Sequence, residues 1–281
     1  MSPTALATLP FQRWRQFVRS FRNVAADRSL PLFRPRDVVR GAWSSSAIAK
    51  ALRADGICIL ERVIDPAKMA ALQKSFEGLV ATCAPGQPGP EDVPNAKSAL
   101  IDFRRDPLFL EIILDELIAA AIEAYYGRPI SLVLSMAQRL EPSDLYEGKA
   151  YQWHHDTKGK YVKAMWLLTD VPSDGQRMSF VCGSHTMTHR WTTYEQTRFS
   201  DAYARRRGRV LECTAPAGSV IVFDTNGIHR GNHNAGQRRD VVVGAYSTGR
   251  YRLGCQVDDR RLGHLSDWQR RIVKRSLRAS T

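Results

Sequence analysis

The second half of the chain contains a series of short apolar segments, and this pattern limits the folds that the chain can adopt more than any other feature. Val, Ile, Leu and aromatic residues dominate each segment, and loops with Gly, Pro, Asp and Asn separate them. The segments are SLVLSMAQRLE, VKAMWLLTDV, RMSFV, GSVIVFDT and DVVVGAYS. Apolar runs of this kind between turn residues are typical of β-strands. Several such strands in succession predict a barrel or a sandwich.

The region before these strands has the periodicity of helices. We predict one helix over Pro66–Val80, with Asp65 as its N-cap and Pro66 in its first turn. A second helix is predicted over residues 106–126, where it ends at Gly127. Helices followed by strands indicate an α+β chain that is mainly β in its second part. A length of 281 residues is enough for one sizeable core.

A group of histidine and aspartate residues lies between the first two of these strands, in YQWHHDTKGKY at residues 151–161. In an extended segment alternate side chains project to the same face, so His154 and Asp156 face one way and His155 faces the other. Two ligands are too few for a metal ion. We expect His229 to supply a third, because in GSVIVFDTNGIHRGNHN a strand over residues 220–223 and a turn over residues 224–228 can return it to this group.

Two imidazoles and one carboxylate form the facial triad of non-haem Fe(II) oxygenases, which leaves coordination positions open for a cosubstrate and dioxygen. We therefore predict that His154, Asp156 and His229 are metal ligands and catalytic residues. Arg238 and Arg239 follow His229 in the chain and precede the apolar strand VVVGAY. A guanidinium that points into the barrel from this position can bind a distal carboxylate through two hydrogen bonds.

Basic residues outnumber acidic ones, and the formal net charge is +13. Net charge acts on solubility and on the choice of partners rather than on the fold, so we expect an anionic partner. No helix-turn-helix, zinc-finger or RNA-recognition motif accompanies the charge, which argues against nucleic acid. The cysteines number five and form no CxxC pair, which is typical of reduced thiols in the cytoplasm.

The first 45 residues are predicted to form a basic extension, separate from a main domain at residues 46–281. Residues 11–24 have the period of an amphipathic helix, with arginines outside its apolar stripe. We predict a cytoplasmic protein that touches an anionic membrane at its inner face through this helix. The alternative is that the stripe packs against the main domain. The stripe comprises Phe11, Trp14, Phe17, Val18, Phe21 and Val24.

These residues together resemble the phytanoyl-CoA dioxygenase-like (PhyH) family of Fe(II)/2-oxoglutarate-dependent oxygenases. The resemblance runs from about residue 54 to residue 246. It rests on DGICILERVIDPAKMAAL, the WHHD metal motif, AMWLLTDV, FVCGSH and GSVIVFD followed by HRGNHN and RR. It implies a double-stranded β-helix, also called a jelly roll, of cupin type with flanking helices. The domain at residues 46–281 would then be the dioxygenase domain.

The resemblance also implies roles for individual residues. His154, Asp156 and His229 would bind Fe(II), and Arg239 would bind the C5 carboxylate of 2-oxoglutarate. Trp166 and Gln138 resemble residues that line the cosubstrate pocket. The sequence departs from the family pattern by having Cys-Gly-Ser-His at residues 182–185 in place of Pro-Gly-Ser/Thr-His, and by an arginine one position nearer the distal histidine. Arg238 is therefore a rival to Arg239, which we prefer because it keeps the usual distance to the following strand.

The activity implied is that of a hydroxylase that uses Fe(II), 2-oxoglutarate and O2 to oxidise a C–H bond. A carboxylate at position 156 leaves no place for a halide ligand, so hydroxylation is favoured over halogenation, with desaturation and epoxidation still open. An acyl-CoA, a phosphorylated metabolite or an acidic glycolipid such as lipopolysaccharide Kdo would suit a basic protein. The alternatives are a non-oxidative cupin-type metalloenzyme and a catalytically inactive binding protein on the same fold.

Overall fold

The computed structural model describes residues 43–83, 96–101, 107–142, 149–156, 161–186, 198–232, 237–248, 263 and 265–277. The helix predicted at residues 11–24 lies outside the described residues, as does nearly all of the predicted extension at residues 1–45. The division of the chain at residue 45 therefore stays a prediction.

Six strands form a large antiparallel sheet in the order β1-β7-β4-β9-β3-β2. Every residue of β7 and β9 is buried, because helices cover one face of the sheet and a second sheet faces the other. The strands are β1 (Ile57–Leu60), β2 (Ala96–Leu100), β3 (Ser131–Leu140), β4 (Tyr161–Leu167), β7 (Val220–Asp224) and β9 (Arg239–Ser247).

Three shorter strands form a second sheet in the order β6-β5-β8. They are β5 (Met178–Val181), β6 (Val210–Cys213) and β8 (His229–Gly231). Apolar side chains from both sheets meet in an inner core, which contains Met165 and Val241 from the large sheet and Met178 and Phe180 from the small one. The fold is the predicted jelly roll with flanking helices, built as two facing sheets that do not close into a barrel within the described residues.

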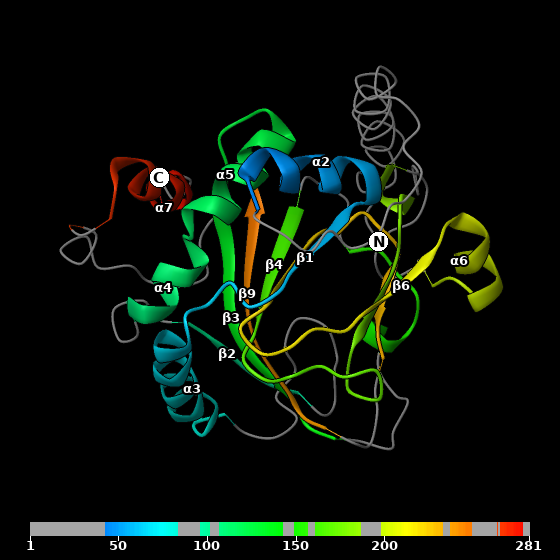
Figure 1. Ribbon diagram of the computed structural model, residues 1–281, viewed down its shortest axis with the longest axis horizontal. Helices are drawn as coiled ribbons and strands as arrows, with labels where there is room; N and C mark the ends of the chain where they lie inside the picture. The colour runs from blue at the N-terminus through cyan, green and yellow to red at the C-terminus, as the bar shows by residue number, and fades with distance from the viewer. Residues whose placement is uncertain are drawn as a thin grey trace, which may run out of the picture.

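Helices cover the other face of the large sheet and form an outer core with it. Figure 1 shows α3, α4 and α7 on one side of this sheet, and β6 with α6 on the other. The helices are α2 (Ser45–Asp55), α3 (Pro66–Val80), α4 (Pro107–Ile113), α5 (Glu116–Tyr126), α6 (Asp201–Arg207) and α7 (Asp267–Leu277), with short 3-10 turns at Lys149–Tyr151 and Ser184–Thr186. None of the helices in the described ranges has both the length and the apolar character needed to cross a bilayer.

The helix predicted over Pro66–Val80 is confirmed as α3, with Asp65 accepting a hydrogen bond from the backbone N of Ala67 at 2.9 Å. The single helix predicted over residues 106–126 is wrong, because the chain forms α4 and α5 instead. The interruption lies at Asp115, whose side chain accepts a hydrogen bond from Ile118 N at 3.0 Å and so caps α5. A short acidic side chain inside an apolar helical pattern favours such a cap over continuation.

Side chains of the central strand β4 alternate between the two cores. Val162, Ala164 and Trp166 belong to the outer core against the helices, whereas Met165 and Leu167 belong to the inner core between the sheets. Strand β9 alternates in the same way, and its inner-core residues include Val241. Odd-numbered positions of β4 and β9 therefore point toward the space between the sheets.

Candidate metal centre

A tight turn brings His229 back toward the large sheet after β7. Asp224 ends β7, and its Oδ1 accepts a hydrogen bond from Asn226 N at 2.8 Å, which starts the turn. Gly227 passes so close to Phe180 that a Cβ atom there would lie 2.2 Å from the Phe180 Cζ atom. The sequence Asp-Thr-Asn-Gly therefore places His229 at the first position of β8.

His154 lies directly opposite His229, where the two residues form an isolated antiparallel bridge. The His154 N donates to His229 O at 2.9 Å, and the His229 N donates to His154 O at 2.8 Å. Two residues further along, the Asp156 N donates to Thr225 O at 3.0 Å. Backbone hydrogen bonds thus hold both parts of the predicted triad in one place.

The side chains of His154, Asp156 and His229 converge, with one nitrogen or oxygen atom from each lying within 4.8 Å of the others. The Asp156 Oδ1 atom is 3.7 Å from His154 Nε2 and 3.5 Å from His229 Nε2. The sequence predicts that these three residues form one site, and the structure brings them together. His155 is not part of this group, and its Nδ1 lies 2.6 Å from the Asp156 carbonyl oxygen.

Both histidines of the triad turn the same ring nitrogen toward the centre. The Nδ1 of His154 lies 2.6 Å from Gln152 O, and the Nδ1 of His229 lies 2.9 Å from Gly227 O. A carbonyl oxygen only accepts hydrogen bonds, so each Nδ1 carries the proton and each Nε2 presents a lone pair. Burial and the neighbouring His229 lower the pKa of His154 to about 3, so this ring is neutral at neutral pH, as a metal ligand must be.

Asp156 uses its two carboxylate oxygens differently. Oδ2 lies 2.8 Å from the Lys163 ammonium, whereas Oδ1 is buried and accepts no hydrogen bond from any residue that the structure describes. Burial by itself would raise the pKa of Asp156, but the positive charge of Lys163 outweighs it and holds the pKa well below its usual range. Two imidazole Nε2 atoms and an ionised carboxylate with a free oxygen fit a divalent metal ion of the iron type.

Arg239 and Arg238 point to opposite sides of the large sheet. Arg239 is buried on the side of the inner core, and its Nε atom has no hydrogen-bond partner among the described residues. Burial lowers the pKa of Arg239 to about 10, which still leaves the guanidinium charged at neutral pH. Arg238 is 48% exposed and lies 3.0 Å from Glu77 on the helix side. Arg239 is therefore the arginine that faces the interior, as preferred from the sequence.

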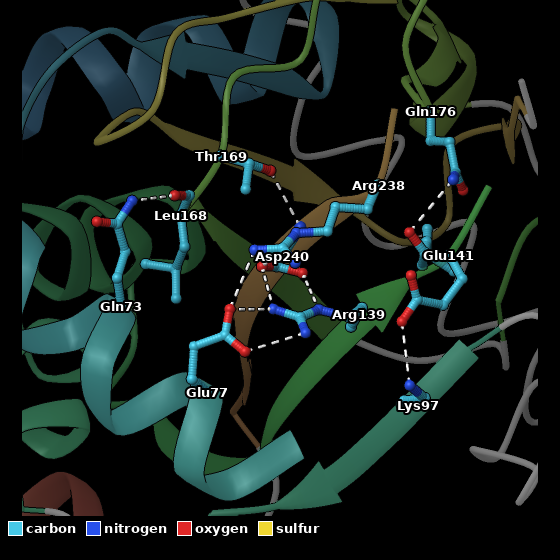
Figure 2. Close-up of polar contacts among 11 residues, drawn as sticks. Gln73, Glu77, Lys97, Arg139, Glu141, Leu168, Thr169, Gln176, Arg238 and Asp240 are labelled. Atoms are coloured by element: carbon cyan, nitrogen blue, oxygen red, sulfur yellow. Dashed lines mark hydrogen bonds and ion pairs between the residues drawn. The ribbon is translucent and has the colours of Figure 1, made fainter. Parts of the chain in front are cut away.

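An ion network of Arg139, Asp240 and Glu77 lies on the helix side of the sheet (Figure 2), where Arg139 and Asp240 are buried and Glu77 is half exposed. The Nε and Nη2 atoms of Arg139 donate to the two carboxylate oxygens of Asp240, both at 2.7 Å. The Nη1 and Nη2 atoms of Arg139 also donate to Glu77 of α3, at 3.1 and 2.6 Å. Because Asp240 adjoins Arg239 in the chain, this network fixes the end of β9 that carries Arg239.

The place of Trp166 in the cosubstrate pocket stays a prediction, and the packing of this residue on the helix side does not support it. Trp166 is 1% exposed and lies in the outer core, where its partners across the sheet are Val220 and Val242. The sequence alone cannot assign the face of this residue, because β4 is apolar on both faces and does not reveal which side meets the helices. Gln138 lies opposite Val241 on the inner face, but its amide donates to Ser98 Oγ of the edge strand β2 at 3.3 Å.

Sequence reasoning missed Lys163 and Arg139. Lys163 occupies an odd-numbered position of β4 and so shares a face with Met165. A charged residue within an otherwise apolar central strand was the available signal for Lys163. Arg139 likewise lies in an apolar strand, two residues before a loop, and gave the same kind of signal.

Comparison with known proteins places this site in context. The sequence model of the phytanoyl-CoA dioxygenase (PhyH) family matches residues 52–241, which is more than half of the chain. The match includes all three residues of the triad together with Arg239. No curated protein sequence is detectably similar to the chain.

Several solved structures share the fold. The non-heme alpha ketoglutarate dependent carbocyclase SnoK from nogalamycin biosynthesis is 19% identical with a TM-score of 0.60, over 80% of this chain and 94% of that one. EctD from S. alaskensis with bound Fe is 19% identical with a TM-score of 0.59, over 86% and 89%. HygX from Streptomyces hygroscopicus, with nickel, 2-oxoglutarate and hygromycin B bound, is 14% identical with a TM-score of 0.55, over 76% and 92%. At these identities the similarity establishes the fold alone.

Proposed function

The chain belongs to the phytanoyl-CoA dioxygenase family, and from this premise we propose that it is an Fe(II)- and 2-oxoglutarate-dependent oxygenase that hydroxylates a C–H bond of an anionic substrate. The observation that carries the proposal is the convergence of His154, Asp156 and His229 within 4.8 Å of one another. The buried guanidinium of Arg239 adds a second, independent feature of such a site.

Each residue has a defined part in this proposal. His154 and His229 bind iron through Nε2, and Asp156 binds it through Oδ1. Arg239 binds the far carboxylate of 2-oxoglutarate through charge-assisted hydrogen bonds, which also supply the partner that its buried Nε needs. When bound, iron and 2-oxoglutarate supply the oxidation itself, in which O2 gives one oxygen atom to succinate and one to the substrate while CO2 is released.

The protein around the triad orients these groups and limits the access of water. The Phe223 ring lies edge-on to the His229 ring with centroids 5.3 Å apart, and the Phe180 ring stacks beside it at 6.4 Å. Packed aromatic rings on this side confine the imidazole to one orientation. The protein's contribution to a cofactor reaction is this positioning and shielding.

Hydroxylation is the proposed outcome because Asp156 keeps a carboxylate in the position that a halide ligand would need. SnoK is described as a carbocyclase, so the fold also accommodates a different oxidation. Product analysis by mass spectrometry separates the outcomes, since hydroxylation adds one oxygen atom whereas desaturation or ring closure removes two hydrogen atoms.

The anionic substrate is supported by the charge near the site. Helix α6 packs beside the triad, because its Ala204 is buried with Trp153 and Ile228, which precede His154 and His229 in the chain. Three successive arginines of α6, at residues 205–207, are exposed. Acyl-CoA, phosphorylated metabolites and acidic glycolipids such as lipopolysaccharide Kdo carry the complementary charge.

Spectroscopy of the anaerobic complex tests the metal assignment. Fe(II) and 2-oxoglutarate together should give a weak visible charge-transfer band, which the single variants His154→Ala, Asp156→Ala and His229→Ala should lose. Retention of the band and of turnover in all three variants would show that the triad is not the metal centre. A non-oxidative cupin-type enzyme would bind metal without responding to 2-oxoglutarate, and an inactive binding protein would release no succinate with any anionic compound.

Contact with a membrane is a further part of the proposal, and it rests on sequence alone because the helix at residues 11–24 lies outside the described part of the chain. Each arginine near an acidic lipid surface contributes about 1 kcal/mol to binding. The full chain should therefore sediment with anionic vesicles and not with zwitterionic ones, and deletion of residues 1–25 should abolish this. Loss of folding on deletion would instead favour a helix packed on its own domain.

A further inference from the structure

Lys163 lies inside the metal centre although it is not one of the proposed ligands. Its Nζ atom is 2.8 Å from Asp156 Oδ2, and the two side chains are only 17% and 13% exposed. A surface ion pair such as Arg270 with Asp267, whose carboxylate is 97% exposed, is screened by solvent. The Lys163 pair is shielded from this screening by its burial.

The backbone of Lys163 is held from both sides, because β4 is a central strand. Lys163 lies opposite Phe223 of β7 and opposite Ala245 of β9. The Phe223 ring in turn contacts the His229 ring, with centroids 5.3 Å apart. The ammonium group is therefore anchored to the same packed strands that position a proposed metal ligand.

This arrangement divides the carboxylate of Asp156 between two tasks. Oδ1 is directed toward His154 Nε2 and His229 Nε2, at 3.7 and 3.5 Å, and accepts no hydrogen bond within the described residues. Oδ2 is engaged by Lys163. A carboxylate that is free to turn can bind a metal with both oxygens, and it would then occupy a coordination position that the cosubstrate or O2 requires.

We propose that Lys163 is a positioning residue, which holds Asp156 Oδ2 so that Asp156 binds the metal through Oδ1 alone. This inference rests on the proposed function, because it assumes that the triad binds a metal. Lys163 itself touches neither iron nor the reacting atoms in this role. It acts through Asp156, as residues around a metal site commonly act through the ligands.

Two opposing effects decide what removal of the Lys163 charge would do. The ammonium repels a divalent cation, so its removal would strengthen metal binding if repulsion dominated. It also fixes the ligand, and partners of metal ligands typically change metal affinity by about 10- to 100-fold when they are removed. We expect the second effect to dominate, because without Lys163 the buried Oδ2 loses its partner and the carboxylate its orientation.

Calorimetric titration of the full-length protein with Co(II), in the presence of 2-oxoglutarate, tests the role. Lys163→Met should weaken Co(II) binding by about 10- to 100-fold, whereas Lys163→Arg, which keeps a cationic donor, should restore most of it. The matched control is Lys97→Met, since Lys97 forms a comparable pair with Glu141 at 3.1 Å on the edge strand β2. This control should bind Co(II) as the unmodified protein does.

The outcomes distinguish a failure of the role of Lys163 from a failure of the metal centre itself. If the unmodified protein binds Co(II), His154→Ala abolishes binding and folded Lys163→Met binds with unchanged or higher affinity, the role of Lys163 is wrong and the metal centre stands. If the unmodified protein binds no Co(II), both are wrong. If Lys163→Met fails to fold, Lys163→Gln takes its place, and Lys163→Arg binding no better than Lys163→Gln would also overturn the proposal.

Discussion

His154 and His229 exchange two backbone hydrogen bonds across an isolated antiparallel bridge, at 2.9 and 2.8 Å. The separation of the two imidazoles is therefore set by the main chain before any metal binds. In addition, the Nδ1 of each ring is already engaged by a carbonyl oxygen, at 2.6 and 2.9 Å. A site built in this way pays little conformational entropy when it takes up an ion.

Metal removal should consequently leave the fold intact. The chelator-treated protein should keep its far-ultraviolet circular dichroism spectrum, and added Co(II) should raise its unfolding temperature. An ion at a concentration of 100 times its Kd stabilises the folded state by about 2.7 kcal/mol. The variant His154→Ala serves as the control and should show no increase. Loss of the dichroism spectrum on chelation would mean that the metal is needed for folding.

Substitution of Arg239 should weaken the use of 2-oxoglutarate much more than substitution of Arg238. Removal of one partner from a buried charge pair costs about 2 to 5 kcal/mol, so Arg239→Ala should raise the KM for 2-oxoglutarate at least about ten-fold. Arg238→Ala removes an exposed contact to Glu77 and should change this KM little. Steady-state succinate release measures both, and the reverse order would assign the carboxylate to Arg238.

Trp166 should matter for stability and not for the cosubstrate. Trp166 fills the outer core against the helices, so Trp166→Ala should lower the free energy of unfolding by about 3 to 5 kcal/mol. Trp166→Phe keeps most of the packing and should leave the KM for 2-oxoglutarate unchanged. A several-fold change in that KM for Trp166→Phe would place the indole in the pocket after all.

Arg139 should influence both stability and the cosubstrate site. Arg139→Met would leave Asp240, which is 4% exposed, as a buried charge with its main partner removed, and breaking such a pair costs about 3 to 5 kcal/mol. Because Asp240 adjoins Arg239, the KM for 2-oxoglutarate should rise in the same variant. Lys97→Met provides the control, since Lys97 pairs with Glu141 and not with β9. An unchanged KM in a folded Arg139→Met protein would contradict this coupling.

The same network predicts a dependence of stability on pH. The hydrogen bonds from Arg139 are the largest influence on Glu77 and hold its pKa below the ordinary value of 4.5. A lowered carboxyl pKa contributes stability that is complete above pH 4.5 and is lost as the pH falls through the lowered value. Unfolding temperatures between about pH 3 and 6 should therefore fall less steeply in Glu77→Gln than in the unmodified protein. Equal slopes would show that Glu77 does not contribute.

The triad was predictable because its signals are local and independent. The spacing of His154 and Asp156 fixes a common face of an extended segment, and a strand followed by a turn delivers His229. The sequence does not reveal which face of a fully buried strand meets which core. β4 is apolar at Met165 and at Trp166 alike, and only the packing of two cores assigns one residue to the interior and the other to the helices. The division of α4 from α5 likewise depended on Asp115 acting as a cap, which competes with an equally good helical continuation.

The alternation of Arg239 and Asp240 along β9 links the proposed cosubstrate site to α3, on the other face of the sheet. Arg239 faces the inner core, and Asp240 is tied through Arg139 to Glu77 of the helix. A library that varies only the pocket lining would hold constant one of the contacts that determine where the guanidinium lies. Redesign of this enzyme for a shorter or longer 2-oxo acid therefore has to vary the helix together with the strand.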